Sequence, residues 1–246
     1  MGFFRKRAPA SRGDRLFCSA VIVAAGSATR MEGRDKIFEY LDGMPVLVHT
    51  MLGFQNCVDI DEIIIVTRQD ALIEVGRLCR TYGIGKAAKI IVGGDSRAQS
   101  VLCGLLETAP AASLIAIHDG ARPFASPELI SSVVKKAAAS GAAAPAIGLR
   151  DTIKAVEGDM VARTLPRDTL AAIQTPQVFE ASLIKGAVQR ALEEHLPITD
   201  DCSAVEALGM RVSLVPGLSH NIKLTTPADF AMAEGIASWL REEQYL

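Results

Sequence analysis

Two cations close to a loop of small residues are the first candidates for chemistry in this chain. Residues 19–31 read SAVIVAAGSATRM, in which an apolar run at 20–25 leads into a small-residue loop at 26–29, then Arg30, with Lys36 six residues later. Small residues let backbone N–H groups approach a ligand, and strand-to-loop turns of this kind bind anions. Two cations suit a triphosphate better than an uncharged ligand. Because a glycine turn also follows strands for steric reasons, the stretch alone leaves a structural turn and an anion site equally open.

A second loop at residues 93–100, GGDSRAQS, again follows a predicted strand and opens a predicted helix. Its glycines permit close backbone approach, and Asp95 and Ser100 supply an acceptor and a hydroxyl for a base or a ribose. The alternative is a plain turn in which Asp or Ser caps the helix.

A third motif, HDGARP at 118–123, places Asp119 at a strand end. A carboxylate opposite a cationic loop is a natural Mg²⁺ ligand, because Mg²⁺ takes one or two carboxylates and completes its shell with phosphate oxygens and water. Alternatively, Arg122 pairs with Asp119 as a structural bridge. We interpret His118, at the end of an apolar strand, as a hydrogen-bonded core residue rather than a catalytic base.

Several well-known motifs do not occur. The sequence contains no GxxxxGK[ST], GxGxxG, GxSxG or HExxH, which weighs against a P-loop NTPase, a dinucleotide oxidoreductase, a serine hydrolase and a zinc protease. A site with cations, one acid and no obvious base or nucleophile fits direct phosphoryl or nucleotidyl transfer. An attacking phosphate monoester, with a second pKa of about 6, is already an anion at neutral pH and needs no base.

Strands and helices alternate with short turns along the first 147 residues. This alternation predicts an α/β fold with a doubly wound, mostly parallel sheet, in which ligands bind at the carboxyl ends of the strands. The later chain continues with helices and strands, and Thr226 is expected to cap a last helix that begins at Pro227. The expected strands are 20–25, 61–67, 89–92, 114–118, 142–147, 211–215 and a short one at 221–224; the expected helices are 45–56, 70–82, 96–108, 127–140, 181–194 and 201–208.

The alternation is interrupted at residues 150–166, RDTIKAVEGDMVARTLP. Two short strands flank a turn at 157–159, which predicts a β-hairpin. A two-stranded hairpin that projects alone is marginal in water. We therefore expect this arm, residues 150–172, to pack against another subunit.

Composition restricts the class of protein. The 246 residues carry a net charge of −2, so nothing in the charge balance indicates a nucleic-acid partner. The five cysteines form no CxxC pair, which is typical of reduced thiols and predicts a cytoplasmic protein. No apolar run reaches membrane-spanning length. Residues 1–17 are predicted to be a basic N-terminal extension, since no apolar signal-peptide core follows the charges, and residues 18–246 a single domain.

Taken together, the motifs resemble one family. AAGSATRM at 24–31, Lys36, GGDSRAQSV at 93–101, HDGARP at 118–123, RDTIK at 150–154, QTPQ at 174–177, TDD at 199–201 and NIKLTTPAD at 221–229 are similar to the 2-C-methyl-D-erythritol 4-phosphate cytidylyltransferases of the non-mevalonate isoprenoid pathway. The resemblance runs through residues 19–240. It implies a Rossmann-like nucleotidyltransferase fold and cytidylyl transfer from CTP to methylerythritol phosphate. It also implies release of pyrophosphate, with Mg²⁺ or another divalent cation as cofactor.

The resemblance also implies roles for individual residues and a homodimer. Arg30, Lys36 and Asp119 match the catalytic set, and Asp119 also matches the metal ligand. The residues that match nucleotide contacts are Ala24, Ala25, Gly26, Gly94, Asp95, Arg97 and Ser100, with Arg97 as a buttress of its loop. The residues that match acceptor contacts are Thr152, Arg167, Thr175, Thr199 and Lys223. In the family, the arm that carries Thr152 and Arg167 crosses to the partner subunit.

One departure from the family pattern concerns the catalytic lysine. The usual PKQ is Asp35-Lys36-Ile37 here, so a carboxylate stands beside Lys36 and is expected to weaken its attraction for phosphate. Three other functions stay open at this point: a cytidylyltransferase for another polyol phosphate such as ribitol 5-phosphate, a non-catalytic nucleotide-binding protein, and, weakly, an NAD-dependent reductase.

Overall fold

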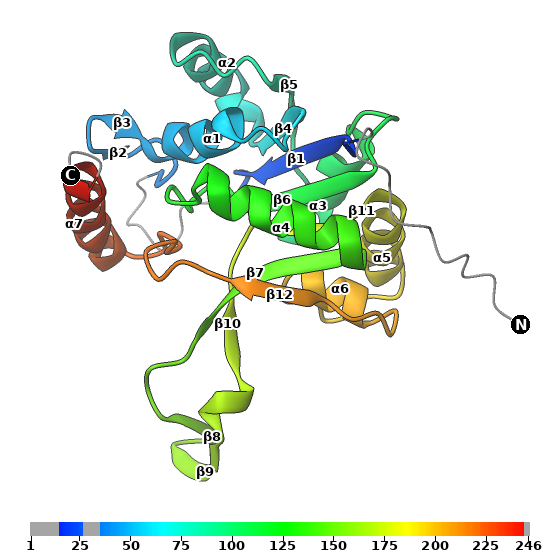
Figure 1. Ribbon diagram of the computed structural model, residues 1–246, viewed down its shortest axis with the longest axis vertical. Coiled ribbons are helices and arrows are strands. Elements are labelled where there is room, and N and C mark those ends of the chain that lie inside the picture. The colour runs from blue at the N-terminus through cyan, green and yellow to red at the C-terminus, as the bar shows by residue number, and fades with distance from the viewer. Residues whose placement is uncertain (1–14, 27–34, 244–246) are drawn as a thin grey trace, which may run out of the picture.

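A central eight-stranded sheet organises the protein in this computed structural model, which describes residues 15–26 and 35–243 (Figure 1). The strand order is β10-β7-β11-β6-β1-β4-β5, and β12 lies off this path and pairs in parallel with β7. Only β10 and β11 run against the other six strands. The predicted doubly wound, mostly parallel sheet is therefore confirmed. Its strands are β1 (Cys18–Val23), β4 (Glu62–Thr67), β5 (Ala87–Val92), β6 (Leu114–Asp119), β7 (Ala142–Gly148), β10 (Ala171–Ile173), β11 (Gln177–Glu180) and β12 (Ser213–Pro216).

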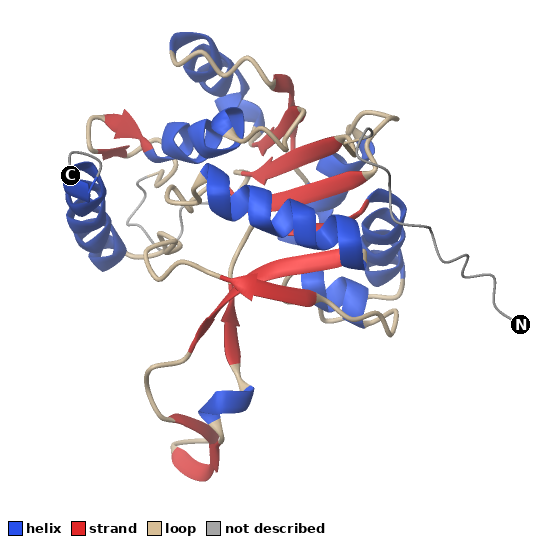
Figure 2. Cartoon of the chain, in the orientation of Figure 1, coloured by secondary structure: helices blue, strands red, loops and turns tan. Residues whose placement is uncertain are grey.

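Helices cover both faces of the sheet (Figure 2). One buried cluster joins the sheet to α1 (Val46–Asn56), α2 (Leu72–Thr81), α4 (Pro127–Ser140) and α7 (Pro227–Glu243). The other joins it to α3 (Arg97–Leu106), α5 (Ala181–Glu193) and α6 (Asp201–Glu206). Between β1 and α1 lies a two-stranded ribbon of β2 (Tyr40–Leu41) and β3 (Met44–Pro45), and a 3₁₀ turn, η1 (Gln69–Ala71), precedes α2. Among the described residues, no helix combines the length and apolarity needed to cross a bilayer.

The apolar strands are buried on both sides, which explains their unbroken hydrophobic runs. In β1, Ala20 and Ile22 pack on the α1–α4 side, whereas Val21 faces α3. Ile64 and Val66 of β4 face the same side as Val21. A strand covered on both faces needs apolar residues at every position, as parallel sheets do.

The structure differs from the sequence-based prediction mainly after residue 166. The expected strand at 221–224 is wrong: this segment has no regular secondary structure, and the amide of Leu224 donates to Ala121 O in the loop after β6 and not to a strand. The strands β10 and β11 were missed, because they are only three and four residues long. β11 lies antiparallel between β6 and β7, and β10 pairs antiparallel with β7. Tertiary pairing, not local pattern, creates these two strands.

The projecting arm is present. β8 (Ile153–Glu157) and β9 (Met160–Leu165) form a separate two-stranded sheet, followed by the 3₁₀ turn η2 (Arg167–Thr169). Figure 1 shows the arm extending away from the central sheet below β7 and β10. Val156, Met160 and Val161 on it are 61–68% exposed. The arm thus presents apolar side chains to its surroundings.

Candidate functional site

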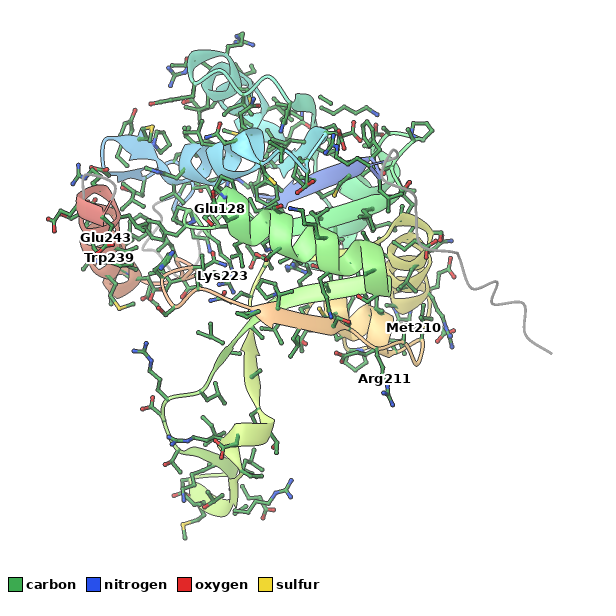
Figure 3. All side chains as sticks on the ribbon, viewed as in Figure 1. Glu128, Met210, Arg211, Lys223, Trp239 and Glu243 are labelled. Atoms are coloured by element: carbon green, nitrogen blue, oxygen red, sulfur yellow. The ribbon has the colours of Figure 1, made fainter. Side chains whose placement is uncertain are left out.

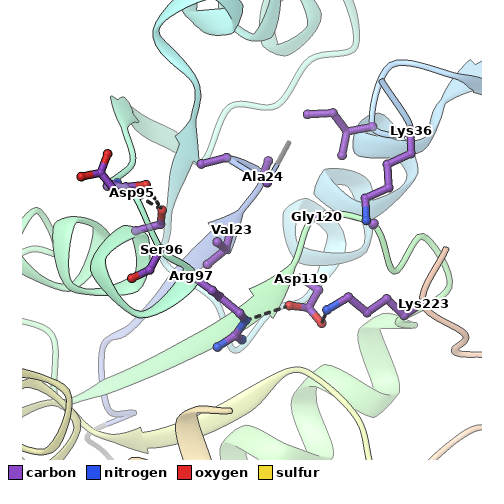
Figure 4. A pocket seen from close by; sticks show the side chains of 15 residues that line it. Val23, Ala24, Lys36, Asp95, Ser96, Arg97, Asp119, Gly120 and Lys223 are labelled. Carbon is purple, nitrogen blue, oxygen red and sulfur yellow. Dashed lines mark hydrogen bonds and ion pairs between the residues drawn. The ribbon is translucent and has the colours of Figure 1, made fainter. Parts of the chain in front are cut away.

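A cavity of about 360 Å³ opens at the carboxyl ends of β1, β5 and β6. This is the edge where ligands bind in doubly wound sheets. Figure 4 shows the loop after β5 on one side and Lys36 on the other, with Asp119 between Arg97 and Lys223. The predicted site residues that line it are Ala24, Ala25, Gly26, Lys36, Gly94, Asp95, Arg97, Ser100, Asp119 and Lys223. The structure therefore brings ten predicted site residues, from five separate segments of the chain, together in one cavity.

Asp119, the last residue of β6, is held by three cations. Its Oδ2 lies 2.9 Å from Lys223 Nζ and 3.5 Å from Arg122 Nε, and its Oδ1 lies 3.4 Å from Arg97 Nε. Burial alone raises the pKa of this carboxyl, but the neighbouring Arg97, Lys223 and Arg122 charges outweigh burial and hold the pKa well below its usual range. Asp119 is therefore an anion at any physiological pH, as a metal ligand must be.

Arg97 connects Asp119 to a buried carboxylate that sequence reasoning did not select. The Arg97 guanidinium makes a fork-like pair with Asp201, with Nη1–Oδ1 at 3.0 Å and Nη2–Oδ2 at 2.8 Å. Asp201 is 2% exposed and begins α6. Such two-point contacts fix both distance and plane. Arg97 therefore links Asp119 to the start of α6, and its role as a buttress of the nucleotide loop stays a prediction. The signal for Asp201 was the acidic TDD before an apolar helix.

The loop after β5 is shaped to bring backbone close to the cavity. Ser96 caps α3 in a capping box with Gln99, so the helix-cap interpretation holds for Ser96. The hydroxyl of Ser100 lies 3.2 Å from both N and O of Gly94. A Cβ on Gly93 would lie 2.6 Å from Ser100 Oγ and 2.7 Å from Ala25 Cβ, so only glycine fits there. The ends of β1, β5 and α3 therefore meet in close contact, with the helix N-terminus favouring an anion.

Lys36 occupies a turn whose neighbours are anchored. Asp35 O accepts hydrogen bonds from the amides of Phe38 (2.9 Å) and Glu39 (3.2 Å). Ile37 is buried, and its carbonyl accepts a hydrogen bond from Leu47 N of α1 at 2.9 Å. Figure 4 shows the Lys36 side chain directed toward the Gly120 region of the cavity. The turn therefore presents the ammonium group to the cavity from the side opposite Asp95.

His118 and Thr175 form a buried support beneath Asp119. The Thr175 hydroxyl lies 2.9 Å from His118 Nδ1 and accepts the amide hydrogen of Asp119 at 3.2 Å, while His118 Nε2 is 3.1 Å from Arg122 O. Burial lowers the pKa of His118 to about 4, so the ring is neutral at pH 7. The interpretation of His118 as a core residue is confirmed. Thr175 is buried, with its hydroxyl committed to this support.

Three predicted site residues lie away from this cavity. Thr152 and Arg167 are exposed on the arm, where Arg167 Nη1 donates to Arg150 O at 2.8 Å. Thr199 is exposed just before α6, and its amide donates to Ser203 Oγ at 3.0 Å. Arg30, most of the 26–29 loop and residues 1–14 of the N-terminal extension lie outside the described residues. Figure 3 shows Lys223, by contrast, on the segment that joins β12 to α7, close to the sheet edge.

Comparison with known proteins connects this geometry to a family. Residues 18–238 match the family described as 2-C-methyl-D-erythritol 4-phosphate cytidylyltransferase. The chain belongs to this family. A cytidylyltransferase of that name from Halalkalibacterium halodurans is 45% identical over 219 residues, which cover 89% of this chain and 96% of the relative. One from Dehalococcoides mccartyi is 42% identical over 216 residues, covering 87% and 93%.

Solved structures of the cytidylyltransferase family share the fold. The 4-diphosphocytidyl-2C-methyl-D-erythritol synthase of Anaerococcus prevotii superposes with a TM-score of 0.81 at 32% identity, covering 90% of this chain and 96% of that one. The Thermus thermophilus cytidylyltransferase gives a TM-score of 0.73 at 31% identity, covering 89% and 98%. The resemblance seen in the sequence is confirmed, and the chain is an enzyme that transfers a cytidylyl group from CTP to methylerythritol phosphate. The ribitol phosphate, non-catalytic and reductase alternatives are not favoured.

Proposed function

We propose that the cavity at the ends of β1, β5 and β6 is where this cytidylyl transfer occurs. The observation that carries the proposal is the anionic Asp119 facing a cavity shared with Lys36 and Lys223. CTP and the acceptor are both phosphorylated, so a site that joins them must neutralise several negative charges while it aligns two phosphorus groups.

The nucleotide occupies the side of the cavity formed by the loops after β1 and β5. Ala25 and Gly26 follow β1 and carry no bulky side chain, so phosphate oxygens can approach their backbone amides. Ala24 lines the same end of the cavity, but its amide donates to Val66 O at 2.7 Å. Gly94, Asp95 and Ser100 provide the contacts to cytosine and ribose, and Arg97 braces that loop through its pair with Asp201. Arg30, which is not among the described residues, is proposed to share with Lys36 the role of neutralising the triphosphate.

A divalent cation, Mg²⁺ in this proposal, fits at Asp119. Within residues 15–26 and 35–243, no three His, Cys, Asp or Glu side chains gather to hold a metal by themselves. One carboxylate at the rim of a triphosphate cavity matches the preference of Mg²⁺ for a few carboxylates, phosphate oxygens and water. When bound, the ion neutralises charge on the triphosphate oxygens. Asp119 would hold the ion. Lys223, 2.9 Å from Asp119, also lines the cavity and is proposed to contact the acceptor phosphate.

The chemical step needs no protein nucleophile. An oxygen of the acceptor phosphate forms a bond to the α-phosphorus of CTP in line with the bond to the β-phosphate, which breaks and releases pyrophosphate. Lys36 stabilises the negative charge that develops at the α-phosphate and on the leaving group. Among the described residues around the cavity, the Ser100 hydroxyl is engaged with Gly94, and His118 is buried and neutral. Neither is arranged to attack phosphorus or to remove a proton.

The acceptor contacts divide between two subunits in this proposal. Lys223 lies in the cavity, whereas Thr152 and Arg167 project on the arm with exposed apolar neighbours. Arms exchanged about a twofold axis would bury those apolar side chains and bring each Arg167 to the other subunit's acceptor phosphate. Thr199 would complete the acceptor set at the start of α6. The enzyme is therefore proposed to be a homodimer with two composite sites.

Mixing two inactive variants tests the composite site. Lys36→Ala removes a cavity residue, and Arg167→Ala removes an arm residue. In a randomly assembled mixture about half of the dimers contain one of each variant, and each of these has one site with both residues intact. We expect pyrophosphate release from CTP and methylerythritol phosphate to recover to about a quarter of the wild-type rate.

The matched control combines Lys36→Ala with Lys223→Ala. Both residues line the same cavity of one chain, so no mixed dimer regains a complete site, and the mixture is expected to stay inactive. A first mixture that is no more active than its two parents would show that each arm serves its own subunit or none.

A further inference from the structure

Asp35, the carboxylate that departs from the family pattern, has its own partner. Its Oδ2 lies 2.5 Å from Arg68 Nη2, and both side chains are about a quarter exposed, at 23% and 28%. Arg68 Nε also lies 3.2 Å from Asp70, but Asp70 is 74% exposed. The Asp35–Arg68 contact is the more enclosed of the two and accordingly the stronger. The hydrogen bond with Asp35 raises the pKa of Arg68 above its ordinary value.

Arg68 reaches Asp35 from the sheet edge that carries the active site. It directly follows β4, whose Val66 is in register with Val23 of β1, so it stands at the carboxyl end of the strand next to β1. Neither Arg68 nor Asp35 lines the cavity, whereas Lys36 does. The turn at 35–37 therefore directs adjacent side chains to different places: Asp35 outward to Arg68, and Lys36 inward to the triphosphate.

We propose that Arg68 is a positioning residue for the transfer reaction, because it binds the Asp35 carboxylate, cancels its charge and keeps it turned away from the anionic substrate at Lys36. Without Arg68, a carboxylate one residue from Lys36 would repel the triphosphate and attract the Lys36 ammonium. The pair therefore compensates for an acidic residue where the family usually has proline. This inference rests on the role proposed above for Lys36.

A simple structural role for Arg68 makes a different prediction. If the pair served only to fasten the turn, loss of either member would impair the enzyme, and loss of both would be no better than loss of one. If Arg68 compensates a charge, removal of the charge should make Arg68 dispensable. A double-mutant cycle separates these cases.

The experiment measures kcat and KM for CTP in four proteins: wild type, Arg68→Ala, Asp35→Asn and the double variant. We expect Arg68→Ala to lower kcat/KM for CTP about tenfold, since an uncompensated charge at this range acts through a partly aqueous medium. Asp35→Asn keeps the shape of the side chain but removes its charge, and its kcat/KM is expected to stay within about twofold of wild type. The double variant should recover to within about twofold of Asp35→Asn. Arg68→Lys, which retains the charge, should retain most of the activity.

Controls keep the outcomes distinct. Arg77→Ala removes a comparable 2.6 Å ion pair with Glu74 on the exposed side of α2 and should leave kcat/KM unchanged. If Arg68→Ala has wild-type activity, or if the double variant is as impaired as Arg68→Ala, the inference is overturned while the proposed function stands. If Lys36→Ala itself retains activity, the proposed function of the cavity is contradicted, independently of the role of Arg68. Melting temperatures measured on all variants identify any that lose activity through unfolding.

Discussion

Lys36→Ala is expected to lower kcat for cytidylyl transfer by a hundredfold or more, about the loss measured when one preorganised transition-state donor is removed. Lys36 presents its ammonium group to the cavity from a turn fixed by buried Ile37 and by the Asp35 carbonyl. Its charge is proposed to act most strongly when the leaving pyrophosphate departs. The loss should therefore appear mainly in kcat, with a smaller effect on KM for CTP.

Lys89→Ala is the matched control for this measurement. Lys89 lies in β5 and pairs with Glu107, just after the end of α3, at 2.7 Å, where both side chains are nearly half exposed. We expect that variant to have wild-type kinetics. A fall of less than tenfold in kcat for Lys36→Ala would count against the role assigned to the lysine.

Asp119→Asn is expected to have the largest combined effect on activity and stability, since it removes both the proposed metal ligand and the negative charge that holds three cations together. We expect kcat to fall about a thousandfold or more, and added Mg²⁺ to restore little of it. Folding should suffer as well, because Arg97, Arg122 and Lys223 would repel one another around a neutral amide. Loss of one member of a buried ion cluster destabilises the folded state by a few kcal/mol. Because Lys223 is 37% exposed, we expect a smaller loss of about 2 kcal/mol in the free energy of unfolding. That loss would lower Tm by about 5 °C.

The stability effect of Asp119 has a defined pH dependence. The folded-state pKa of this carboxyl lies below its unfolded value of about 4, so its contribution to stability is fully present above pH 4 and is lost as pH falls toward the folded pKa. The difference in Tm between wild type and Asp119→Asn should be constant from pH 5 to 8 and shrink below about pH 4. Glu234→Gln, on the exposed side of α7, should change neither Tm nor kcat. Equal Tm values for wild type and Asp119→Asn at pH 7 would contradict the ion cluster.

Local patterns predict most of this fold because burial on both faces of a parallel sheet leaves a clear mark. The helix predicted at 127–140 coincides with α4, since Pro127 begins it, Ser126 caps it and Gly141 ends it at a φ of 83°. β1 is found two residues earlier than expected, because Ala24 and Ala25 continue the apolar run beyond the last paired residue. The segments that failed, β10, β11 and 221–224, are short and take their conformation from distant partners.

The candidate site was likewise predictable from sequence only in part. Small-residue loops and the Asp119 carboxylate could be found from sequence, since strand ends on one sheet edge must meet. Contacts between residues far apart in the chain could not: Arg97 and Asp201 are separated by 104 residues, and Arg68 and Asp35 by 33. The expectation that Asp35 weakens the attraction of Lys36 for phosphate stays a prediction; it was made from neighbours in sequence, without the Arg68–Asp35 pair. The extension at 1–17, the single domain and the subunit crossing of the arm stay predictions.

The most direct test of the proposed site is a crystal structure of the enzyme with CTP, Mg²⁺ and methylerythritol phosphate. It should show the α-phosphate between Lys36 and an ion bound to Asp119. The cytosine should lie on the Gly94–Ser100 side, and the acceptor phosphate should contact Lys223 and Arg167 of a second chain. A triphosphate bound elsewhere, or an acceptor phosphate on the far side of the cavity from Lys223, would contradict it.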